Sequence, residues 1–270
     1  MRTFIVLAWL MATAFAAPFF FDNIYDYSDE LAEFYSKVSE YIDDAKGVHT
    51  ATTACDSSKI ALPAYASGLP SPDNQKPLYV ALGHGTQVRN NCTFRSPTLL
   101  HVADPTQNYS CATSTADSKP VAIGAVASLY NATCIAASYP DMLDTLPNIA
   151  LKLQLPTTSW ATLPYANLNL LGHHFFEGST PVFNLDTTSQ RQYGIAFTKK
   201  GAQLPAPSSA VQGANGAVAW LYLTTTTGTV GDYESVYRVD TAAGSPPETC
   251  ENQPSVITMP YAANYYFFGK

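Results

Sequence analysis

The sequence predicts a mainly β fold, an antiparallel β-sandwich or barrel, with an N-terminal amphipathic helix. Short runs rich in Thr, Val, Tyr and Phe alternate with turn residues about every ten positions, which is typical of all-β domains. Strands that alternate with long helices, as in nucleotide-binding α/β folds, are not seen in the pattern. The chain has 270 residues, 46% of them hydrophobic, which is enough to bury the core of such a domain.

The first residues predict a secretory signal peptide. Residues 1–16 contain one Arg, an apolar run from Phe4 to Leu10, and small residues up to Ala16, after which we expect cleavage. The segment is too short for a transmembrane anchor, and no later apolar stretch is long enough to span a membrane. The sequence therefore predicts a secreted protein, extracellular or in the cell wall, in a compartment where disulfides persist.

Residues 17–50 predict an acidic amphipathic helical segment. Apolar residues recur at three- and four-residue spacing, acidic residues stand in the first turn, Lys46 stands in the last turn, and Gly47 follows it. A helix that docks on the main domain, a partner-binding segment and a removable pro-segment all remain open. The repeating apolar positions are Leu31, Phe34, Tyr35, Val38, Tyr41, Ile42 and Ala45.

Two further parts follow this segment. Residues 51–77 contain several prolines among Ser, Ala and Gly, and they predict an irregular strap. Residues 78–270 are the expected β-rich domain. Its expected strands are LYVAL, VAIGAVASLY, IALKLQL, LNLLGHHFF, PVFNL, YGIAFTKK, AVAWLYLTTTT, ESVYRVD and ANYYFFG.

The charge of the chain argues against nucleic acid as a partner. The sequence has 14 basic and 21 acidic residues, a formal charge of −7, and removing Arg2 with the leader makes it one unit more negative. No basic run interrupts this acidic balance. Such a surface repels phosphate backbones.

Four blocks in the second half carry a family resemblance: LGHHFFEGSTPVFNL, GAVAWLYL, VYRVDTAAGSPPETC and MPYAANYYFFG. They resemble a family of secreted fungal proteins, with bacterial relatives, that is described as a domain of unknown function and is often labelled malate dehydrogenase in genomes. The resemblance implies a β-rich extracellular domain. It supplies no catalytic residues.

The residues do not support the malate dehydrogenase label. The run LYVALGHGTQV contains Gly83-x-Gly85, but Val88 replaces the third glycine of the dinucleotide fingerprint, and no helix follows to face a pyrophosphate. No Gly-x-Ser-x-Gly elbow and no His-Glu-x-x-His motif occurs. We therefore expect no cofactor and no metal.

One family block is split in this chain. The family has a block resembling GTQNYTCA, and deleting residues 88–107 here restores GTQNYSCA. Val88 codons begin with GT and a Gln107 codon can end in CAG, so the segment has the ends of a small translated intron. Our hypothesis is a retained intron in the gene model, and the alternative is a genuine glycosylated surface loop.

Five cysteines in a secreted chain leave one without an intramolecular partner. Cys92 lies in the suspect segment, so four remain, and four cysteines can pair in three ways. The expected pairing is Cys111 with Cys134 and Cys55 with Cys250. Sequons predict a glycoprotein, with acceptor sites at Asn91, Asn108 and Asn131.

Arg238 marks the candidate ligand site. It lies among apolar and aromatic neighbours in VYRVD, and a buried Arg must be paired. Asp240 would share its face of an extended strand, so an ion pair is expected, and an anion or carbohydrate site is the alternative. His173 and His174 should point to opposite faces. Aromatic rings could add a sugar-stacking platform, or simply pack in the core. The candidate ligand-site residues are His173, His174, Arg238, Trp220, Tyr261 and Tyr265.

The leading hypothesis from the sequence is a secreted, disulfide-stabilised glycoprotein that acts by binding a polysaccharide or a host or cell-surface component. One alternative is an extracellular carbohydrate-active enzyme with His173, His174 and Arg238 in one cleft. Another is a structural wall or spore-coat protein. The catalytic residues of the enzyme alternative and the oligomeric state stay open.

Overall fold

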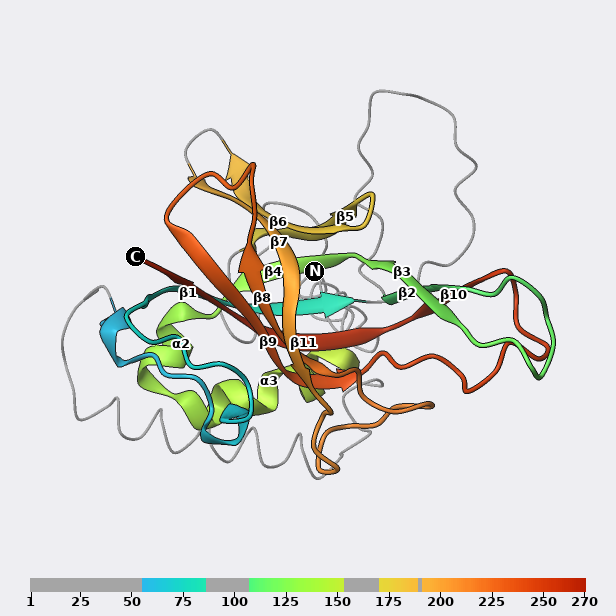
Figure 1. Cartoon of the computed structure of the whole chain (residues 1–270). Helices are drawn as coiled ribbons and strands as arrows, with labels where there is room; N and C mark the ends of the chain where they lie inside the picture. The colour runs from blue at the N-terminus through green and yellow to red at the C-terminus, as the bar shows by residue number, and fades with distance from the viewer. Residues whose placement is uncertain (1–54, 86–106, 153–169, 189–190) are drawn as a thin grey trace, which may run out of the picture. The chain divides into compact units, whose positions relative to one another are not determined.

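A closed antiparallel β-barrel is the centre of the structure (Figure 1). The computed structural model describes residues 55–85, 107–152, 170–188 and 191–270. The predictions for the signal peptide, for the helical segment, and for Asn91 and Cys92 fall outside the described residues. The barrel confirms the predicted fold class and selects the barrel over the sandwich.

Eight strands close the barrel, and a three-stranded sheet extends from one end of it. In the order in which they pair, the barrel strands are β1 (Lys76–Gly85), β11 (Tyr261–Gly269), β9 (Tyr233–Ala243), β8 (Trp220–Thr225), β7 (Arg191–Leu204), β6 (Thr180–Thr188), β5 (Leu170–Glu177) and β4 (Ala127–Asn131). The smaller sheet has the order β10 (Val256–Met259), β2 (Gln107–Ser110) and β3 (Val121–Ala125). The helical elements of the described residues are the short 3-10 turns η1 (Ser57–Lys59) and η2 (Ala64–Ala66), and the helices α2 (Thr133–Ser138) and α3 (Pro140–Lys152).

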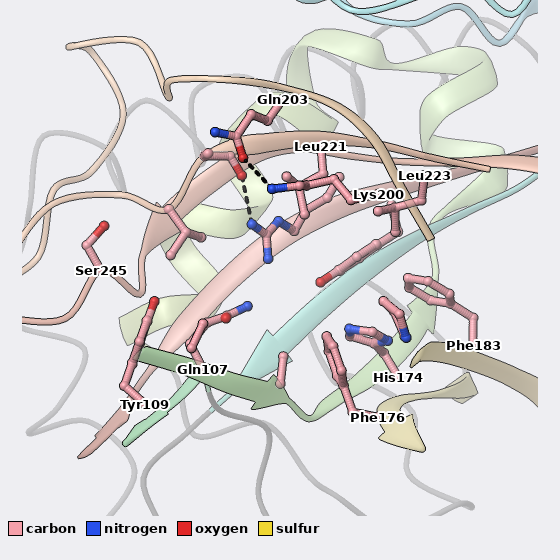
Figure 2. Close-up of a pocket in the computed structure, with 17 residues that line it drawn as sticks. Gln107, Tyr109, His174, Phe176, Phe183, Lys200, Gln203, Leu221, Leu223 and Ser245 are labelled. Carbon is pink, nitrogen blue, oxygen red and sulfur yellow. Dashed lines mark hydrogen bonds between the residues drawn. The ribbon is translucent and has the colours of Figure 1, made fainter. Parts of the chain in front are cut away.

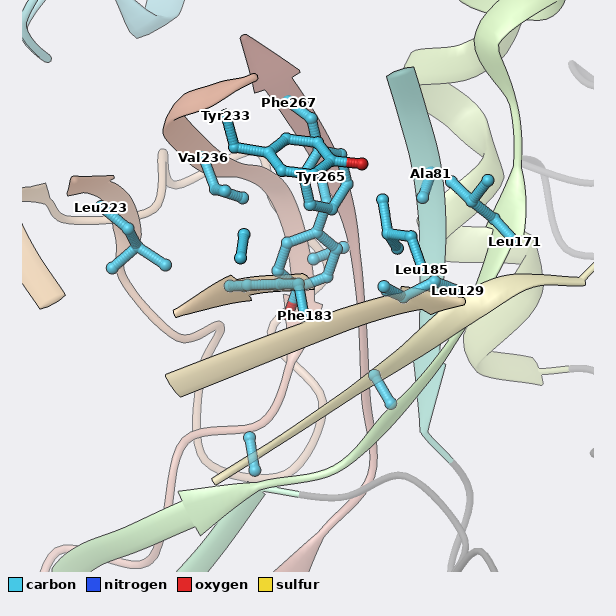
Figure 3. Close-up of a cluster of buried hydrophobic side chains, with 14 of the residues drawn as sticks. Ala81, Leu129, Leu171, Phe183, Leu185, Leu223, Tyr233, Val236, Tyr265 and Phe267 are labelled. Atoms are coloured by element: carbon cyan, nitrogen blue, oxygen red, sulfur yellow. The ribbon is translucent and has the colours of Figure 1, made fainter. Parts of the chain in front are cut away.

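Side chains that point into the barrel form the main core (Figure 3). In β11, Tyr261, Tyr265 and Phe267 belong to this cluster because alternate residues of a strand share a face. All nine residues of β11 are buried, since α3 packs on the outer side of the strand. An eight-stranded barrel is just wide enough for its interior to be filled by side chains or to hold one small ligand.

The helix α3 corrects one strand prediction. The run IALKLQL was expected to be a strand, but residues 149–152 form the end of α3. Its apolar residues Leu143, Leu146 and Ile149 recur every three positions and are buried on one face of the helix. Pro140 stands at the first helical position, where its missing N–H costs nothing.

A proline inside α3 is compensated by the barrel. Pro147 has no N–H, so it cannot donate the usual helix hydrogen bond to the carbonyl of Leu143. The side-chain amide of Asn264, on the outer face of β11, donates to that carbonyl at 3.1 Å. The freed backbone acceptor is thereby satisfied in a buried place.

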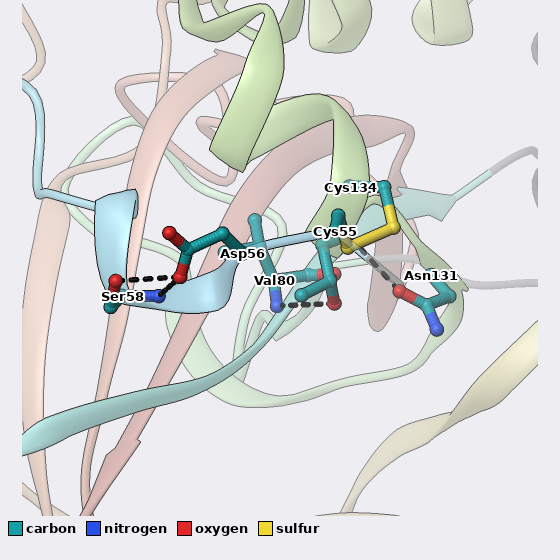
Figure 4. The surroundings of a disulfide bond; sticks show 7 residues. Cys55, Asp56, Ser58, Val80, Asn131 and Cys134 are labelled. Atoms are coloured by element: carbon teal, nitrogen blue, oxygen red, sulfur yellow. Dashed lines mark hydrogen bonds between the residues drawn. A yellow bond between two sulfur atoms is a disulfide. The ribbon is translucent and has the colours of Figure 1, made fainter. Parts of the chain in front are cut away.

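The two disulfides differ from the predicted pairing. Cys55 bonds to Cys134, with their Cα atoms 5.1 Å apart (Figure 4), and Cys111 bonds to Cys250, with 5.7 Å between Cα atoms. The expected Cys111–Cys134 and Cys55–Cys250 pairs are therefore wrong. The sheet register explains the result, because β2 and β10 pair directly and bring the segments around Cys111 and Cys250 together.

The other disulfide joins the N-terminal turns to the start of α2. Thr133, beside Cys134, accepts a hydrogen bond from the backbone N–H of Val80 at 3.1 Å. The side-chain oxygen of Asn131 accepts from the N–H of Thr133 at 3.0 Å. These contacts hold the first residues of α2 against β1, where the chain from Cys55 reaches them.

Candidate functional site

The end of the barrel next to the three-stranded sheet contains a cavity of about 370 Å³ (Figure 2). Residues of β2 and β3 line it together with residues of six barrel strands. Much of the wall is apolar or aromatic, as in most small-molecule sites. The principal apolar lining residues are Phe176, Phe183, Leu221, Leu223 and Val218.

Arg238 is the buried cation of this cavity. It lies in β9 opposite Tyr265 of β11 and Leu221 of β8, and both neighbours also line the cavity. Only 8% of the Arg238 surface is exposed. Its Nη2 donates to the carbonyl of Ala219 at 2.8 Å, whereas its Nε has no hydrogen-bond partner among the described residues.

The described residues that line the cavity include no carboxylate to offset this charge, since none of them is Asp or Glu. Lys200 adds a second cation, which is exposed at the surface and donates to Gln203 at 3.2 Å. A charged guanidinium in a largely desolvated, acid-free wall favours a negatively charged group beside it.

The expected ion pair between Arg238 and Asp240 is wrong. The register of β9 against β11 shifts between Val239 and Ala242, and Asp240 has a positive φ of 51°. This bulge breaks the alternation that would have put the two side chains on one face. The Asp240 carboxyl instead accepts hydrogen bonds from the hydroxyl of Tyr65 and from the amide of Asn264, each at 3.0 Å.

Burial changes the protonation of that carboxyl. Desolvation raises the pKa of Asp240 to about 7, with a further upward contribution from the charge of Asp144, while the hydrogen bonds from Asn264 and Tyr65 act in the opposite direction. Asn264 also contacts α3 through Leu143. Asp240 therefore belongs to the contact between the barrel and α3, not to the cavity.

His174 lines the cavity as a neutral side chain. Its Nδ1 lies 2.9 Å from the carbonyl of Val182, and since a carbonyl can only accept, Nδ1 carries the proton and Nε2 the lone pair. The imidazole stacks on Phe183 with 4.2 Å between ring centroids (Figure 2). Burial lowers the pKa of His174 to about 4, and the charge of Arg238 acts in the same direction.

Tyr265 and Tyr261 form a hydroxyl pair behind Arg238. Their hydroxyl oxygens lie 2.9 Å apart, and both side chains are buried. Burial raises the pKa of both phenols, although the charge of Arg238 opposes that shift. Both therefore stay protonated at neutral pH and can donate hydrogen bonds. Of the two, Tyr265 lines the cavity.

Three of the six predicted ligand-site residues line the cavity: His174, Arg238 and Tyr265. The other three do not line it. Tyr261 contacts Tyr265 from within the core. His173 follows the opposite alternation of β5, and Trp220 packs against Tyr65 with ring centroids 5.3 Å apart. Of the two uses left open for the aromatic rings, core packing is the one observed, because Trp220, Tyr261 and Tyr265 are all buried.

Sequence reasoning missed the contribution of β2 and of the rim. Gln107 and Tyr109 line the cavity from β2, and Lys200 and Gln203 line it from the end of β7 (Figure 2). Lys200 lay in the predicted strand YGIAFTKK, but only the closure of the barrel shows that this strand ends at a cavity. The hydroxyl of Tyr109 also donates to the carbonyl of Gly244 at 2.8 Å.

The surroundings of Arg238 are suited to holding an anion. The described lining has no pair of carboxylates of the kind that glycoside hydrolysis uses. Among the described residues there is also no group of three or more His, Cys, Asp or Glu side chains that could hold a metal ion. The helices in the described part of the chain are too short or too polar to cross a membrane.

Two family models match the chain. One, described as "Protein of unknown function (DUF3455)", matches residues 92–269, which is more than half of the chain. The other, described as "Protein of unknown function (DUF2990)", matches residues 8–70. No curated protein and no solved structure matches the chain.

Proposed function

Because the chain belongs to the DUF3455 family, whose function is unknown, we propose a function from the cavity itself: the protein binds a small organic anion in the end of its barrel. The observation that carries this proposal is Arg238. It is a nearly buried guanidinium with an unpartnered Nε, in a cavity with no carboxylate among its described lining residues. A charged donor in this position gains most from a charged acceptor.

The neighbours of Arg238 indicate which kind of anion fits. Tyr265 can add a hydroxyl donor, and His174 can accept one hydrogen bond at Nε2. The aromatic and aliphatic wall would cover an apolar body. A carboxylate on a short aliphatic or aromatic frame meets these conditions, and a cavity of about 370 Å³ suits a compact molecule.

This site changes the emphasis of the sequence-based hypothesis. Binding remains the proposed activity, but a ligand inside the barrel replaces a polymer that stacks on exposed rings, because the three candidate rings Trp220, Tyr261 and Tyr265 are buried. A wall, glycan or host-surface ligand would have to present a small acidic group to the cavity.

The proposed place of action is outside the cytosol. The two disulfides support an oxidising compartment. The leader-like residues 1–16, the sequons at Asn108 and Asn131, and the resemblance to secreted fungal proteins support a secreted glycoprotein.

Calorimetry with matched ligands tests the proposal. The panel is hexanoate, octanoate, benzoate and cinnamate, each beside its primary amide, which has the same shape without the charge. We expect at least one carboxylate to bind the full chain and its amide to bind more weakly. Arg238→Met should weaken carboxylate binding about tenfold to hundredfold, the range for a charged hydrogen bond.

Lys199→Met is the matched control, because it removes an exposed cation from β7 that does not line the cavity. It should change affinity by no more than about fivefold. Circular dichroism must show that both variants remain folded. Equal binding of a carboxylate and its amide, or unchanged affinity in a folded Arg238→Met variant, would contradict the proposal.

A further inference from the structure

The strands β1 and β2 continue one another along the same neighbours, although residues 86–106 separate them in the chain. On one side, β1 pairs with β11 and β2 pairs with β10. On the other side, β1 pairs with β4 and β2 pairs with β3. In each case a single residue separates the two partner strands, Pro260 on the first side and Val126 on the second.

The ladder with β10 and β11 fixes how many residues fit between β1 and β2. Gly85 pairs with Tyr261, and Gln107 pairs with Met259. Only Pro260 lies between those two partners. If the register runs on without interruption, one residue therefore fits between Gly85 and Gln107.

The ladder with β3 and β4 gives the same answer independently. His84 pairs with Ser128, and Gln107 pairs with Ala125. Two residues lie between these partners, so two residues fit between His84 and Gln107, of which Gly85 is the first. Both ladders thus have room for one residue between Gly85 and Gln107. The chain has 21 residues there, 86–106, which is a surplus of twenty.

The inward-facing positions of β1 and β2 are consistent with an even number of surplus residues between the two strands. In β1, Ala81 belongs to the interior cluster, and a Cβ on Gly83 would meet Tyr265, so the odd positions face the barrel interior. In β2, the odd positions Gln107 and Tyr109 line the cavity. Removing an even number of residues keeps this alternation, whereas removing an odd number reverses every side chain of β2.

We propose that β1 and β2 are two halves of one strand and that twenty residues, 87–106, are an insertion that neither the barrel nor the cavity requires. Because positions 87 and 107 are both Gln, deleting 87–106 gives the same chain as deleting 88–107. The shortened chain keeps Gln107 and every other described residue, with Thr86 alone joining Gly85 to Gln107.

Three deletions test this inference through the register that it predicts. The first removes residues 87–106. The second removes 88–106 and so leaves one residue too many, and the third removes 86–106 and leaves one too few. All three also remove Cys92, so they have the same number of cysteines. Apart from its deletion, each variant is the full chain.

We expect the 87–106 deletion to fold, to have both native disulfides and no free thiol, and to melt at least as high as the full chain. The two control deletions put β2 out of register, so they should melt several degrees lower and form less of the Cys111–Cys250 bond, because Cys111 follows the displaced strand. Thermal denaturation, thiol titration and peptide mapping measure these outcomes.

Two results would overturn the inference. One is an unfolded 87–106 deletion beside a folded full chain, and the other is equal melting and equal disulfide content in all three deletions. Neither readout uses a ligand, so the inference stands or falls separately from the proposed binding function.

Discussion

At the scale of single residues, Arg238 and Asp240 show where sequence periodicity stops being informative. Strict alternation put both side chains on one face, and the bulge at Asp240 separates them, with Asp240 under α3 and Arg238 in the cavity. Asp is one of the few residues that adopt a positive φ readily, but the sequence does not reveal where a bulge falls. By contrast, the opposite faces of His173 and His174 follow from a regular strand and were predictable.

Asp240 also gives a testable pH dependence. Because burial raises its pKa from 3.8 to about 7, the folded protein retains a proton that the unfolded chain loses between about pH 4 and about pH 7. The contribution of Asp240 to stability therefore falls as the pH rises through that window. In Asp240→Asn this contribution no longer varies, so the free energy of unfolding of the variant, relative to the wild type, should rise from pH 4 to pH 7.

Urea denaturation at a series of pH values measures this difference. The buried His84 and His174 titrate in both proteins, so their effects cancel in the comparison. Asp117→Asn, at an exposed position, is the control that makes the same change of side chain. A flat difference for Asp240→Asn would contradict the assigned pKa.

At the scale of elements, the strands were more predictable than the helices. Expected runs correspond to β1, β5, β6, β7, β8, β9 and β11, and the expected run VAIGAVASLY covers both β3 and β4. Such runs can be predicted because β-branched and aromatic residues and turn punctuation are local signals. The run IALKLQL was misread because a short apolar run fits a strand and a buried helix equally well. Its helical state depends on packing against the barrel, which only the tertiary structure shows.

The interrupted strand leads to a prediction about the gene. If the twenty surplus residues come from a retained intron, the mature message should lack their codons. Sequencing transcripts across the codons for Gly85 to Asn108 should give most reads with the two halves joined. Reads that contain codons 88–107 in most messages would instead establish a genuine insertion in the protein.

At the scale of the whole molecule, the number of paired cysteines was predictable and their connectivity was not. Four described cysteines form two bonds, but three pairings were possible, and the choice depends on which strands become neighbours. The same holds for the cavity. Arg238, His174 and Tyr265 were identified by residue type, whereas Gln107 and Lys200 join them only because the barrel closes.

The two disulfides should stabilise different regions. Replacing both cysteines of either pair with Ser should cost about 2–5 kcal/mol of unfolding free energy. Loss of Cys111–Cys250 should also speed amide hydrogen exchange in β2 and β10, because that bond lies in the small cluster with Tyr109 and Ile257. Loss of Cys55–Cys134 should leave exchange in those two strands unchanged.

Exchange followed by mass spectrometry distinguishes the two variants. Equal acceleration of amide exchange in β2 and β10 in both variants would mean that the disulfides stabilise the fold only globally. The double variant in which all four cysteines are replaced checks that the two effects are additive.

The proline within α3 has a consequence for how the helix is positioned. Apolar contacts between a helix and a barrel are not directional, so apolar burial by itself does not specify one placement of the helix. A single open carbonyl at Leu143 is different, because only one placement of the helix brings it to the amide of Asn264. By leaving the carbonyl of Leu143 without its helical donor, Pro147 thus provides the one acceptor that specifies which turn of α3 meets β11.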